Sequence, residues 1–367
     1  MTIFAERQSR AIDLMKAAGL GAAVFVPGAN FTYLTGVHLH LMERPTLFAL
    51  TADAGAFAVM PALERQKWST AMPEAETFYW DDADGPGNAF ASLAQAIGVS
   101  DALGVEGLRM RAAEYLALSR HWRTEDLIDA DAAMTDLRIL KSADEIAELR
   151  RAIAISETAL EETLDAGIRG RSEREIAARL KSAMLSHGAS GFAFDPIVLT
   201  GGEAANPHGD PGERIVTAGQ PLLIDFGASY GDMHADITRT AFCDHVSDAH
   251  AEIYETVLAA NRAGLAAVEV GAPVSAVDAA ATGVLAGSRF ADMILHKTGH
   301  GLGREVHEAP QVMRGNDRPQ QAGMVITIEP GLYRPEEIGV RIEDDVLITE
   351  AGGESLTSFD RNLRIVA

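Results

Sequence analysis

Short apolar runs alternate with helical patterns along the first third of the chain. Apolar positions over residues 3–18 recur at near-helical spacing, and two glycines then end this pattern. The run AAVFV (22–26) predicts a buried strand that ends in a Pro-Gly turn. TYLTG comes next, followed by the strand-like runs TLFALTA and AFAVM and by helical patterns around residues 62–72 and 88–97. This alternation predicts a small α/β domain over residues 1–136.

Longer amphipathic helices follow from Lys141 onward. The segment SADEIAELRRAIAISETALEETLDAG opens with the capping box Ser142 and Glu145. A second capping box, Ser172 and Glu175, opens the next helical pattern. Two consecutive helices are therefore expected before the first hairpin.

The order helix, helix, hairpin occurs twice in this part of the chain. Residues 249–267 and 274–286 give the second pair of helical patterns, and each pair precedes a hairpin. Such an order indicates an internal duplication. The expected architecture is α+β, with a curved antiparallel sheet in a domain spanning residues 137–367.

Composition excludes several classes of protein. The 367-residue chain has a formal net charge of −22 at pH 7, which argues against nucleic-acid binding because no basic patch neutralises phosphates. Its single cysteine, Cys243, excludes an internal disulfide and a thiolate zinc site, and is expected to be a buried strand residue. The charged N-terminal segment lacks the apolar core of a signal peptide, and no run of about 18 apolar residues predicts a membrane span. A cytoplasmic protein is expected.

Two pairs of carboxylates occupy the predicted hairpins. Asp225 and Asp236 are eleven residues apart on either side of a Gly-Asp turn, and Glu329 and Glu343 are fourteen apart around a longer loop. Acids that face one another repel strongly unless cations lie between them. Together with His300, these acids form an oxygen-rich set that suits two divalent ions about 3.5–4 Å apart, as in two-metal hydrolases.

A single acidic residue on a strand is more commonly a solvated side chain than a metal ligand. Asp225 and Glu329, however, directly follow the apolar runs LLI and VITI, where a solvated face is not expected. Asp344 and Asp345 alternate faces beside Glu343, and are expected either behind the ligands or at the surface. The coincidence of all five donors supports the metal site.

Three further histidines, His208, His296 and His307, are candidates for hydrogen bonds to a developing oxyanion or for proton transfer. Two of them share the segment HKTGHGLGREVHEAP with His300. Taken alone, a histidine of this kind is equally well a hydrogen-bonded structural residue, but the neighbouring ligands favour a functional role. The glycines of TGHGLG permit close backbone approach at His300.

Four segments, DFGASYGDMHADITRT, HKTGHGLGREVHEAP, TIEPGLY and GVRIEDDVLIT, closely resemble those of the pita-bread metallopeptidases. Within that family they are similar to the branch of Xaa-Pro dipeptidases (prolidases) and Xaa-Pro aminopeptidases, over about residues 137–367. YLTG and the α/β pattern around it resemble the creatinase-type N-terminal domain of the same branch. The resemblance implies a pita-bread catalytic domain preceded by a smaller α/β domain.

The resemblance also implies roles for individual residues. Asp225 would hold one ion, Asp236 and Glu343 would bridge both ions, and His300 with Glu329 would complete the second site. Glu329 would also handle the proton of the attacking water. Catalytic or substrate-binding roles fall on His208, His296, His307 and Arg341, the last through Asp225 or a neighbouring carboxylate. Manganese is the first expectation for the two ions, with Co²⁺, Zn²⁺ or Fe²⁺ as alternatives.

The implied activity is hydrolysis of an Xaa-Pro bond in dipeptides or short peptides, by an Xaa-Pro dipeptidase or, alternatively, an Xaa-Pro aminopeptidase. A dipeptidase must bind a free carboxylate, and Arg44 is the candidate, from the same or the partner subunit of an expected homodimer. The alternative for Arg44 is a solvent-exposed loop arginine. Tyr333 and Phe192 are candidates for a proline pocket, or else plain core residues. No nucleic-acid or membrane partner is expected.

Two other classes of function remain open. A non-hydrolytic enzyme on the same scaffold, such as a creatinase, typically lacks the full ligand set. A catalytically inactive binding protein would have lost ligands, and all five are present here. The hydrolase is therefore favoured over both.

Overall fold

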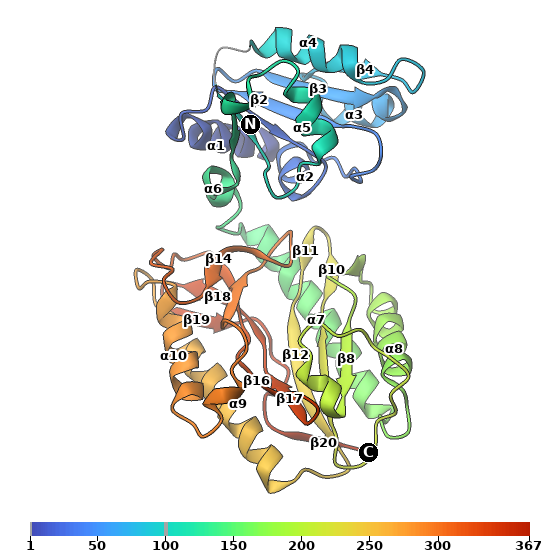
Figure 1. Ribbon diagram of the computed structural model, residues 1–367, viewed down its shortest axis with the longest axis vertical. Helices are drawn as coiled ribbons and strands as arrows, with labels where there is room; N and C mark the ends of the chain where they lie inside the picture. The colour runs from blue at the N-terminus through green and yellow to red at the C-terminus, as the bar shows by residue number, and fades with distance from the viewer. Residues whose placement is uncertain (1, 99–101) are drawn as a thin grey trace. The chain divides into compact units, whose positions relative to one another are not determined.

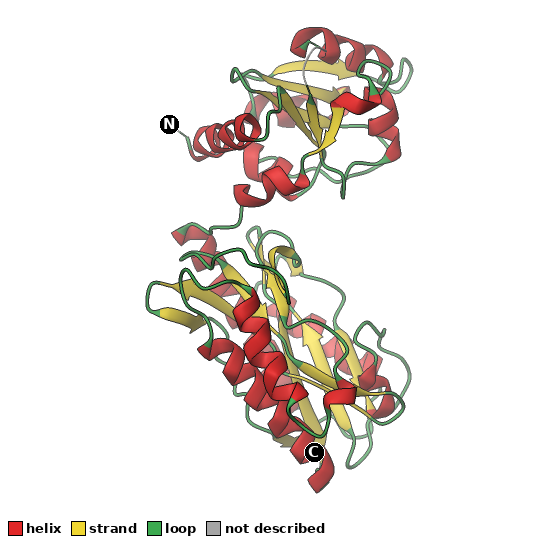
Figure 2. Ribbon diagram, turned by 60° about the vertical axis from the view of Figure 1, so that its left-hand side comes forward, coloured by secondary structure: helices red, strands yellow, loops and turns green. Residues whose placement is uncertain are grey.

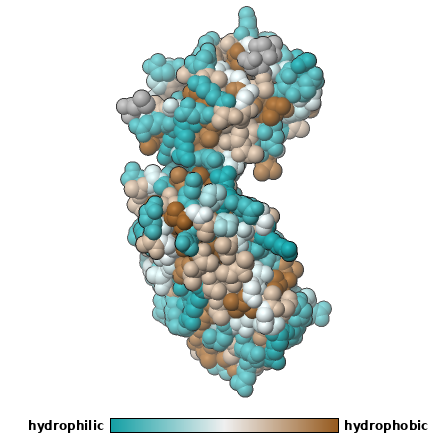
Figure 3. Space-filling model, turned by 90° about the vertical axis from the view of Figure 1, so that its left-hand side faces the viewer, coloured by the Kyte–Doolittle hydropathy of each residue, from teal (hydrophilic) through white to brown (hydrophobic). Residues whose placement is uncertain are grey.

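The computed structural model describes residues 2–98 and 102–367. The chain divides into two compact units, Met1–Arg138 (the N-terminal unit) and Ile139–Ala367 (the C-terminal unit), each with its own sheets and helices (Figure 1). In the described part of the chain, every helix is too short or too polar to traverse a bilayer. On the face drawn in Figure 3, hydrophilic residues are interspersed with small hydrophobic groups.

A six-stranded sheet in the order β4-β3-β2-β1-β5-β6 forms the centre of the N-terminal unit. Its strands are β1 (Ala22–Phe25), β2 (Leu47–Thr51), β3 (Ala56–Pro61), β4 (Glu76–Trp80), β5 (Leu103–Val105) and β6 (Leu127–Asp129). β1 runs antiparallel to β2 and parallel to β5, and β3 runs parallel to β4. Parallel neighbours require crossover connections, and helices supply most of them.

Helices cover both faces of this sheet (Figure 2). They are α1 (Ile3–Ala17), α2 (Ala29–Thr35), α3 (Arg65–Ala71), α4 (Gly87–Ile97), α5 (Ala112–Leu118) and α6 (Asp131–Met134). Because side chains alternate along a strand, Ala23 and Phe25 share a core with α1, α2 and α3, whereas Ala22 and Val24 share one with α4 and α5. The N-terminal unit is the α/β structure that the alternating pattern predicts.

The segment TYLTG forms the last turn of a helix and its C-terminal cap. It belongs to α2, which follows Gly28 and ends at Gly36 in the left-handed conformation, with a φ of 70°. Phe31 and Leu34 of this helix are buried in the core beneath the sheet. Tertiary burial therefore outweighs the strand preference of its threonines and tyrosine.

Glu106 is a carboxylate buried in the N-terminal unit, with 4% of its surface exposed. Its oxygens accept hydrogen bonds from the backbone N–H of Val26 at 2.8 Å and from Asn30 Nδ2 at 2.9 Å. Burial raises the pKa of Glu106 to about 7, and these two hydrogen bonds act in the opposite direction. Folding therefore favours the protonated carboxyl.

The stability of the N-terminal unit is expected to fall as pH rises, because the pKa of Glu106 is higher in the folded state than its ordinary 4.5. This contribution is fully present below about pH 4.5 and is lost as pH rises through about 7. Between pH 6 and 8 the wild type should lose about 1.4 kcal/mol more unfolding free energy than Glu106→Gln. All three tryptophans, Trp68, Trp80 and Trp122, lie in this unit, so denaturant unfolding followed by tryptophan fluorescence measures it. Equal pH slopes for the two proteins would contradict the prediction.

Two pairs of helices support the strands of the C-terminal unit. α7 (Ala143–Asp165) and α8 (Glu173–Ser186) pack against β9 and β12, whereas α9 (Asp248–Ala266) and α10 (Ser275–Ala286) pack against β15, β17 and β18. Both predicted capping boxes are formed, at Ser142 with Glu145 and at Ser172 with Glu175. The predicted order of two helices and a hairpin, repeated once, is thus observed.

The strands of this unit form a four-stranded sheet β20-β12-β9-β8, a five-stranded sheet β14-β13-β15-β18-β19, a three-stranded sheet β11-β10-β7 and the pair β16-β17. Apart from β12 with β20, the named strands of the described C-terminal unit pair antiparallel. The α+β class is therefore confirmed. The bounds are β7 (Gly191–Phe192), β8 (Ile197–Thr200), β9 (Pro221–Phe226), β10 (Ala228–Tyr230), β11 (Met233–His234), β12 (Ile237–Cys243), β13 (Gly299–Gly301), β14 (Glu308–Val312), β15 (Val325–Ile328), β16 (Gly331–Arg334), β17 (Ile338–Arg341), β18 (Asp344–Thr349), β19 (Gly352–Ser355) and β20 (Arg364–Val366). Cys243 is buried at the end of β12, as predicted.

Candidate metal centre

The first pair of carboxylates belongs to the hairpin that β9 and β12 form. Asp225 lies in β9 opposite Thr238, and Asp236 directly precedes β12. A Cβ atom at Gly227 would lie only 1.7 Å from the carbonyl oxygen of Ala235. The two backbones can approach so closely because residue 227 is glycine. This approach brings the two aspartates to the same part of the hairpin.

The second pair of carboxylates lies where β15 ends and β18 begins. Glu329 directly follows β15, and Glu343 directly precedes β18. The last pair in the register of these antiparallel strands is Ile328 with Asp344. Continuing the register by one residue places the two glutamates opposite one another.

His300 is held at the middle of β13 between two glycines. A Cβ atom at Gly299 would lie 2.1 Å from the carbonyl oxygen of Thr327, and one at Gly301 would lie 2.0 Å from that of Ala309. Larger residues would push β13 away from its two neighbouring strands. The glycines on either side of His300 therefore allow the close backbone approach expected from TGHGLG.

Donor atoms from these elements form three overlapping groups, each with its atoms within 4.8 Å of one another. The groups are Asp225, Asp236 and Glu343; His300, Glu329 and Glu343; and Asp236, His300 and His307. The first two groups contain all five predicted ligands and share Glu343. The third group adds His307 as a further donor, whereas the sequence resemblance implied a catalytic or substrate-binding role for it.

Electrostatic repulsion within this cluster is strong. Burial raises the pKa of Asp236 well above its ordinary value, and the charges of Glu343, Asp225, Asp345 and Glu329 raise it further. Burial raises the pKa of Glu343 in the same way, with Glu329 and Asp225 adding to the effect. Such a group of acids holds its charge only with a compensating cation.

The orientation of His300 shows that its second ring nitrogen faces the carboxylates. Its Nδ1 lies 3.0 Å from the carbonyl oxygen of Gly301, which can only accept, so Nδ1 carries the proton. Burial lowers the pKa of His300 to about 3, which leaves the imidazole neutral. The Nε2 lone pair then lies 3.4 Å from Glu329 Oε1 and 3.6 Å from Asp236 Oδ2. Three electron-pair donors that face one another in this way fit a metal cation between them.

Asp225 offers a further sign of a cation site. Its Oδ2 accepts a hydrogen bond from Arg341 Nη2, whereas its buried Oδ1 has no hydrogen-bond partner among the residues that the structure describes. A buried carboxylate oxygen without a partner is costly unless an ion binds it. Carboxylate oxygens with one imidazole suit divalent ions such as Mn²⁺, Co²⁺, Zn²⁺ or Fe²⁺, so the residues present fit the predicted metals.

The ligands line one side of a cavity of about 670 Å³. Apolar walls come from Phe194, Ile197, Leu295 and Val306, and the polar lining includes Asn206, Lys297 and the histidines His208, His296 and His307. His208 and His307 are exposed. A small apolar chamber with a few polar groups and a metal-binding wall is suited to a small organic ligand.

His296 takes part in a chain of hydrogen bonds that leads away from Asp225. Arg341 Nη1 donates to the hydroxyl of Tyr333 at 3.2 Å, and that hydroxyl lies 2.7 Å from His296 Nε2. His296 Nδ1 lies 2.7 Å from the carbonyl oxygen of Lys297, so Nδ1 is the donor and Tyr333 donates to Nε2. Both ring nitrogens of His296 are therefore occupied by protein groups.

The two aromatic residues expected around a proline pocket do not line this cavity. Tyr333 is buried in the chain described above, with 4% exposure. Phe192, in β7, packs against the core beneath α7 and α8, and Lys181 Nζ lies 5.6 Å from its ring centre. Phe194, two residues further on, lines the cavity instead. Of the two roles considered for Tyr333 and Phe192, that of core residues agrees better with their surroundings than that of pocket residues.

Arg44 lies in the loop before β2 of the N-terminal unit and is bound by two acids. Its Nε and Nη2 donate to Asp82 at 2.9 and 2.8 Å, and its Nη1 donates to Glu43 at 2.6 Å. The hydrogen bond with Asp82 raises the pKa of Arg44. Any substrate carboxylate would have to compete with these two acids, so the predicted role of Arg44 remains a prediction.

Sequence reasoning missed Thr238 and Lys297. The Thr238 hydroxyl donates to Glu343 Oε2 at 2.6 Å and accepts from Arg341 Nε at 2.9 Å, so it fixes a predicted ligand. Its position two residues after Asp236 is the signal, because alternate strand residues share a face. The signal for Lys297 is a lone cation between His296 and His300 in the sequence.

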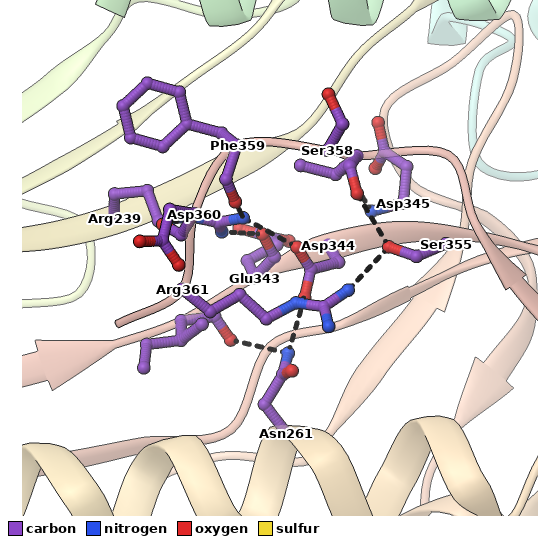
Figure 4. A network of polar contacts seen from close by, with 12 residues as sticks. Arg239, Asn261, Glu343, Asp344, Asp345, Ser355, Ser358, Phe359, Asp360 and Arg361 are labelled. Carbon is purple, nitrogen blue, oxygen red and sulfur yellow. Dashed lines mark hydrogen bonds and ion pairs between the residues drawn. The ribbon is translucent and has the colours of Figure 1, made fainter. Parts of the chain in front are cut away.

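A buried network behind the ligands centres on Asp344 (Figure 4). Its Oδ1 accepts from Arg239 Nη2 at 2.7 Å, and its Oδ2 accepts from Asn261 Nδ2 at 2.9 Å and from Arg361 Nε at 2.6 Å. Asp345 is also buried, and its Oδ2 accepts from the backbone N–H of Asp236 at 3.2 Å. The alternative that these two acids lie at the surface is therefore wrong.

The same network also forms hydrogen bonds with the backbone next to the two glutamates. Arg239 Nη1 donates to the carbonyl oxygen of Glu343 at 2.6 Å. Asn261 Nδ2 donates to the carbonyl oxygens of Ile328 at 3.1 Å and Ile342 at 3.3 Å, each one residue before a glutamate ligand. The buried acid thus orients the polypeptide on which the ligands sit.

Comparison with known proteins gives matches along nearly the whole chain. A model of the metallopeptidase family M24 matches residues 147–350, and a model of the creatinase/prolidase N-terminal domain matches residues 7–140. An uncharacterized peptidase of Staphylococcus aureus (strain MW2) is 31% identical over 353 residues, which cover 96% of this chain and 99% of that protein.

Two solved structures have the same fold over their full length. A recombinant prolidase from Thermococcus sibiricus superposes with a TM-score of 0.93 at 31% identity, covering 100% of each chain. The dipeptidase PepE from Mycobacterium ulcerans superposes with a TM-score of 0.92 at 32% identity, covering 99% of this chain and 98% of that one. Both units of the chain described above therefore have counterparts in these proteins.

Proposed function

The chain belongs to the metallopeptidase family M24, and from that premise we propose that it hydrolyses Xaa-Pro peptide bonds as an Xaa-Pro dipeptidase. Its creatinase/prolidase N-terminal domain and its close likeness to a prolidase and a dipeptidase support this choice of substrate. The observation that carries the proposal is the convergence of four acids and His300 on one cavity, with lone pairs facing one another. An Xaa-Pro aminopeptidase is the alternative.

We assign the two-metal site to Asp225, Asp236, His300, Glu329 and Glu343, with manganese as the first choice of ion. Divalent ions held there would lower the pKa of a bound water toward neutrality and would polarise the scissile carbonyl. No serine or cysteine nucleophile is then required. Arg341 and Thr238 keep Asp225 and Glu343 in place through the hydrogen bonds described above.

Glu329 is the group we assign to proton transfer. Burial raises its pKa to about 7, while the charge of Arg341 acts in the opposite direction. A carboxylate at this position can accept the proton of the attacking water and return it to the nitrogen of the leaving proline. Its position beside His300 Nε2, at 3.4 Å, keeps it at the centre of the site.

The histidines around the cavity divide into two kinds. His208 and His307 are exposed in the cavity, where an N–H group can donate to the oxygen of the scissile carbonyl. Partial desolvation of the imidazole in the cavity lowers the pKa of His307, which favours the neutral form as the donor. His296, with both ring nitrogens occupied, acts by positioning its neighbours.

The proposal is tested by offering the purified protein, loaded with Mn²⁺, two substrates side by side. We expect it to release free proline from Ala-Pro, and to cleave Ala-Pro-Ala much more slowly, as measured by chromatography of the products. Excess chelator should abolish the activity, and added Mn²⁺ should restore it. Preferred cleavage of the tripeptide would move the assignment to the aminopeptidase, and a metal-loaded protein that cleaves neither would refute the proposed function.

A further inference from the structure

Two cationic side chains line the cavity, and they differ in their partners. Arg341 is buried, and its guanidinium is occupied by Asp225, Thr238 and Tyr333. Lys297 is exposed, and its Nζ donates to the amide oxygen of Gln311. Among residues 2–98 and 102–367, no carboxylate forms an ion pair with Lys297. This lysine thus brings an unneutralised positive charge to the cavity.

The backbone around Lys297 is fixed on both sides. Its carbonyl oxygen accepts from His296 Nδ1 at 2.7 Å. The next residue, Thr298, donates its N–H and its hydroxyl to Asp278 Oδ1 at 3.1 and 2.7 Å. Only the side chain of Lys297 is therefore left to adjust, and the amide of Gln311 restrains its end. A cation held in this way is suited to bind an anion at a defined place.

The rest of the cavity repels anions. Four carboxylates, Asp225, Asp236, Glu329 and Glu343, occupy the ligand wall. The free carboxylate of an Xaa-Pro dipeptide lies only two bonds from the nitrogen of the scissile bond. It must therefore sit inside this cavity, close to the reacting atoms, and it needs a cation there.

Lys297 lies three residues before His300 in the sequence and lines the same cavity as His307 and Glu329.

We propose that Lys297 binds the free C-terminal carboxylate of the substrate and so makes the enzyme selective for dipeptides. This inference rests on the proposed function and names the specificity residue of that same site. It also differs from the sequence-based assignment of this role to Arg44, whose guanidinium already binds Asp82 and Glu43. Gln311 is then the residue that orients the ammonium group of Lys297.

The experiment compares Ala-Pro with Ala-Pro-amide, which has no negative charge. For each protein the readout is kcat/KM for Ala-Pro divided by kcat/KM for Ala-Pro-amide. Lys297→Met should lower this ratio by about 10–100-fold, mainly through a higher KM for Ala-Pro, as expected for a charge-assisted hydrogen bond to a carboxylate. Lys297→Arg should recover most of the ratio because it keeps the charge. Lys181→Met, which removes a half-buried lysine outside the cavity, should keep the wild-type ratio.

The outcomes separate this proposal from the function on which it rests. If the wild type cleaves Ala-Pro and Lys297→Met keeps the wild-type ratio, Lys297 does not bind the carboxylate although the peptidase assignment stands. If Arg44→Ala lowers the ratio and Lys297→Met does not, the carboxylate is bound from the N-terminal unit. If the metal-loaded wild type cleaves neither compound, both proposals fail. Lys297→Arg is the control for misfolding. If this variant recovers the wild-type ratio, the lower ratio of Lys297→Met results from the missing charge.

Discussion

Asp236→Ala is expected to abolish metal binding and to lower kcat/KM for Ala-Pro by more than about 1000-fold. Asp236 belongs to two of the three groups of donor atoms. Its loss leaves neither proposed ion with a full set of ligands. The metal content after dialysis, measured by mass spectrometry, and the initial rate of proline release check this directly.

In the metal-free protein, the same substitution should raise the melting temperature. Burial and four neighbouring acids raise the pKa of Asp236, so removing it relieves repulsion. Addition of Mn²⁺ should raise the melting temperature of the wild type and leave that of Asp236→Ala unchanged. Glu350→Ala, at an exposed turn of the same unit, should respond to Mn²⁺ as the wild type does. An active Asp236→Ala enzyme that holds no metal would rule out the two-metal site.

Asp344→Ala is expected to destabilise the C-terminal unit by roughly 3–5 kcal/mol, because it leaves buried positive charge without its partner. Arg239 is almost fully buried and its ion pair with Asp344 measures 2.7 Å. Asn261 and Arg361 lose the same acceptor. Denaturant unfolding followed by far-ultraviolet circular dichroism measures the effect, since this unit contains no tryptophan.

A double-mutant cycle isolates the buried pair. The double variant Asp344→Ala with Arg239→Met should lose less unfolding free energy than the sum of the two single variants, because neither charge is then left unpaired. Asp344→Asn keeps one acceptor oxygen and should fall between the wild type and Asp344→Ala. Additive losses in the cycle would show that the pair does not stabilise the fold as a unit.

Much of the fold follows from local rules in the sequence. Capping residues such as Ser142 and Ser172 fix where α7 and α8 begin, and both capping boxes are formed. Apolar runs that end in an acid, at Asp225 and Glu329, predict strands whose last side chains turn toward a shared cavity. Four of the five donors come together because the two hairpins carry them at or beside strand ends, where register is fixed by core residues, and His300 joins them from β13.

What the sequence could not give depends on partners distant along the chain. Asp344 looks like any charged residue in EDD, and only the fold supplies Arg239, over 100 residues earlier, as its partner. Arg44 resembles a free loop arginine until Asp82 is placed beside it. Phe192 and Phe194 differ by two residues, and the strand pattern alone does not tell which one faces the cavity. The role of Lys297 could not be predicted because a single cationic residue forms no periodic pattern in the sequence.

The network around Asp344 also sets an order of events during synthesis of the protein. The N-terminal unit draws all its strands from β1 to β6, so it can fold while the ribosome is still translating the rest. In the C-terminal unit, by contrast, Asp344 lacks one of its partners until Arg361 has emerged, and β12 lacks its neighbour β20 until residues 364–366 follow. The candidate metal centre is therefore expected to be completed only after these residues have left the ribosome.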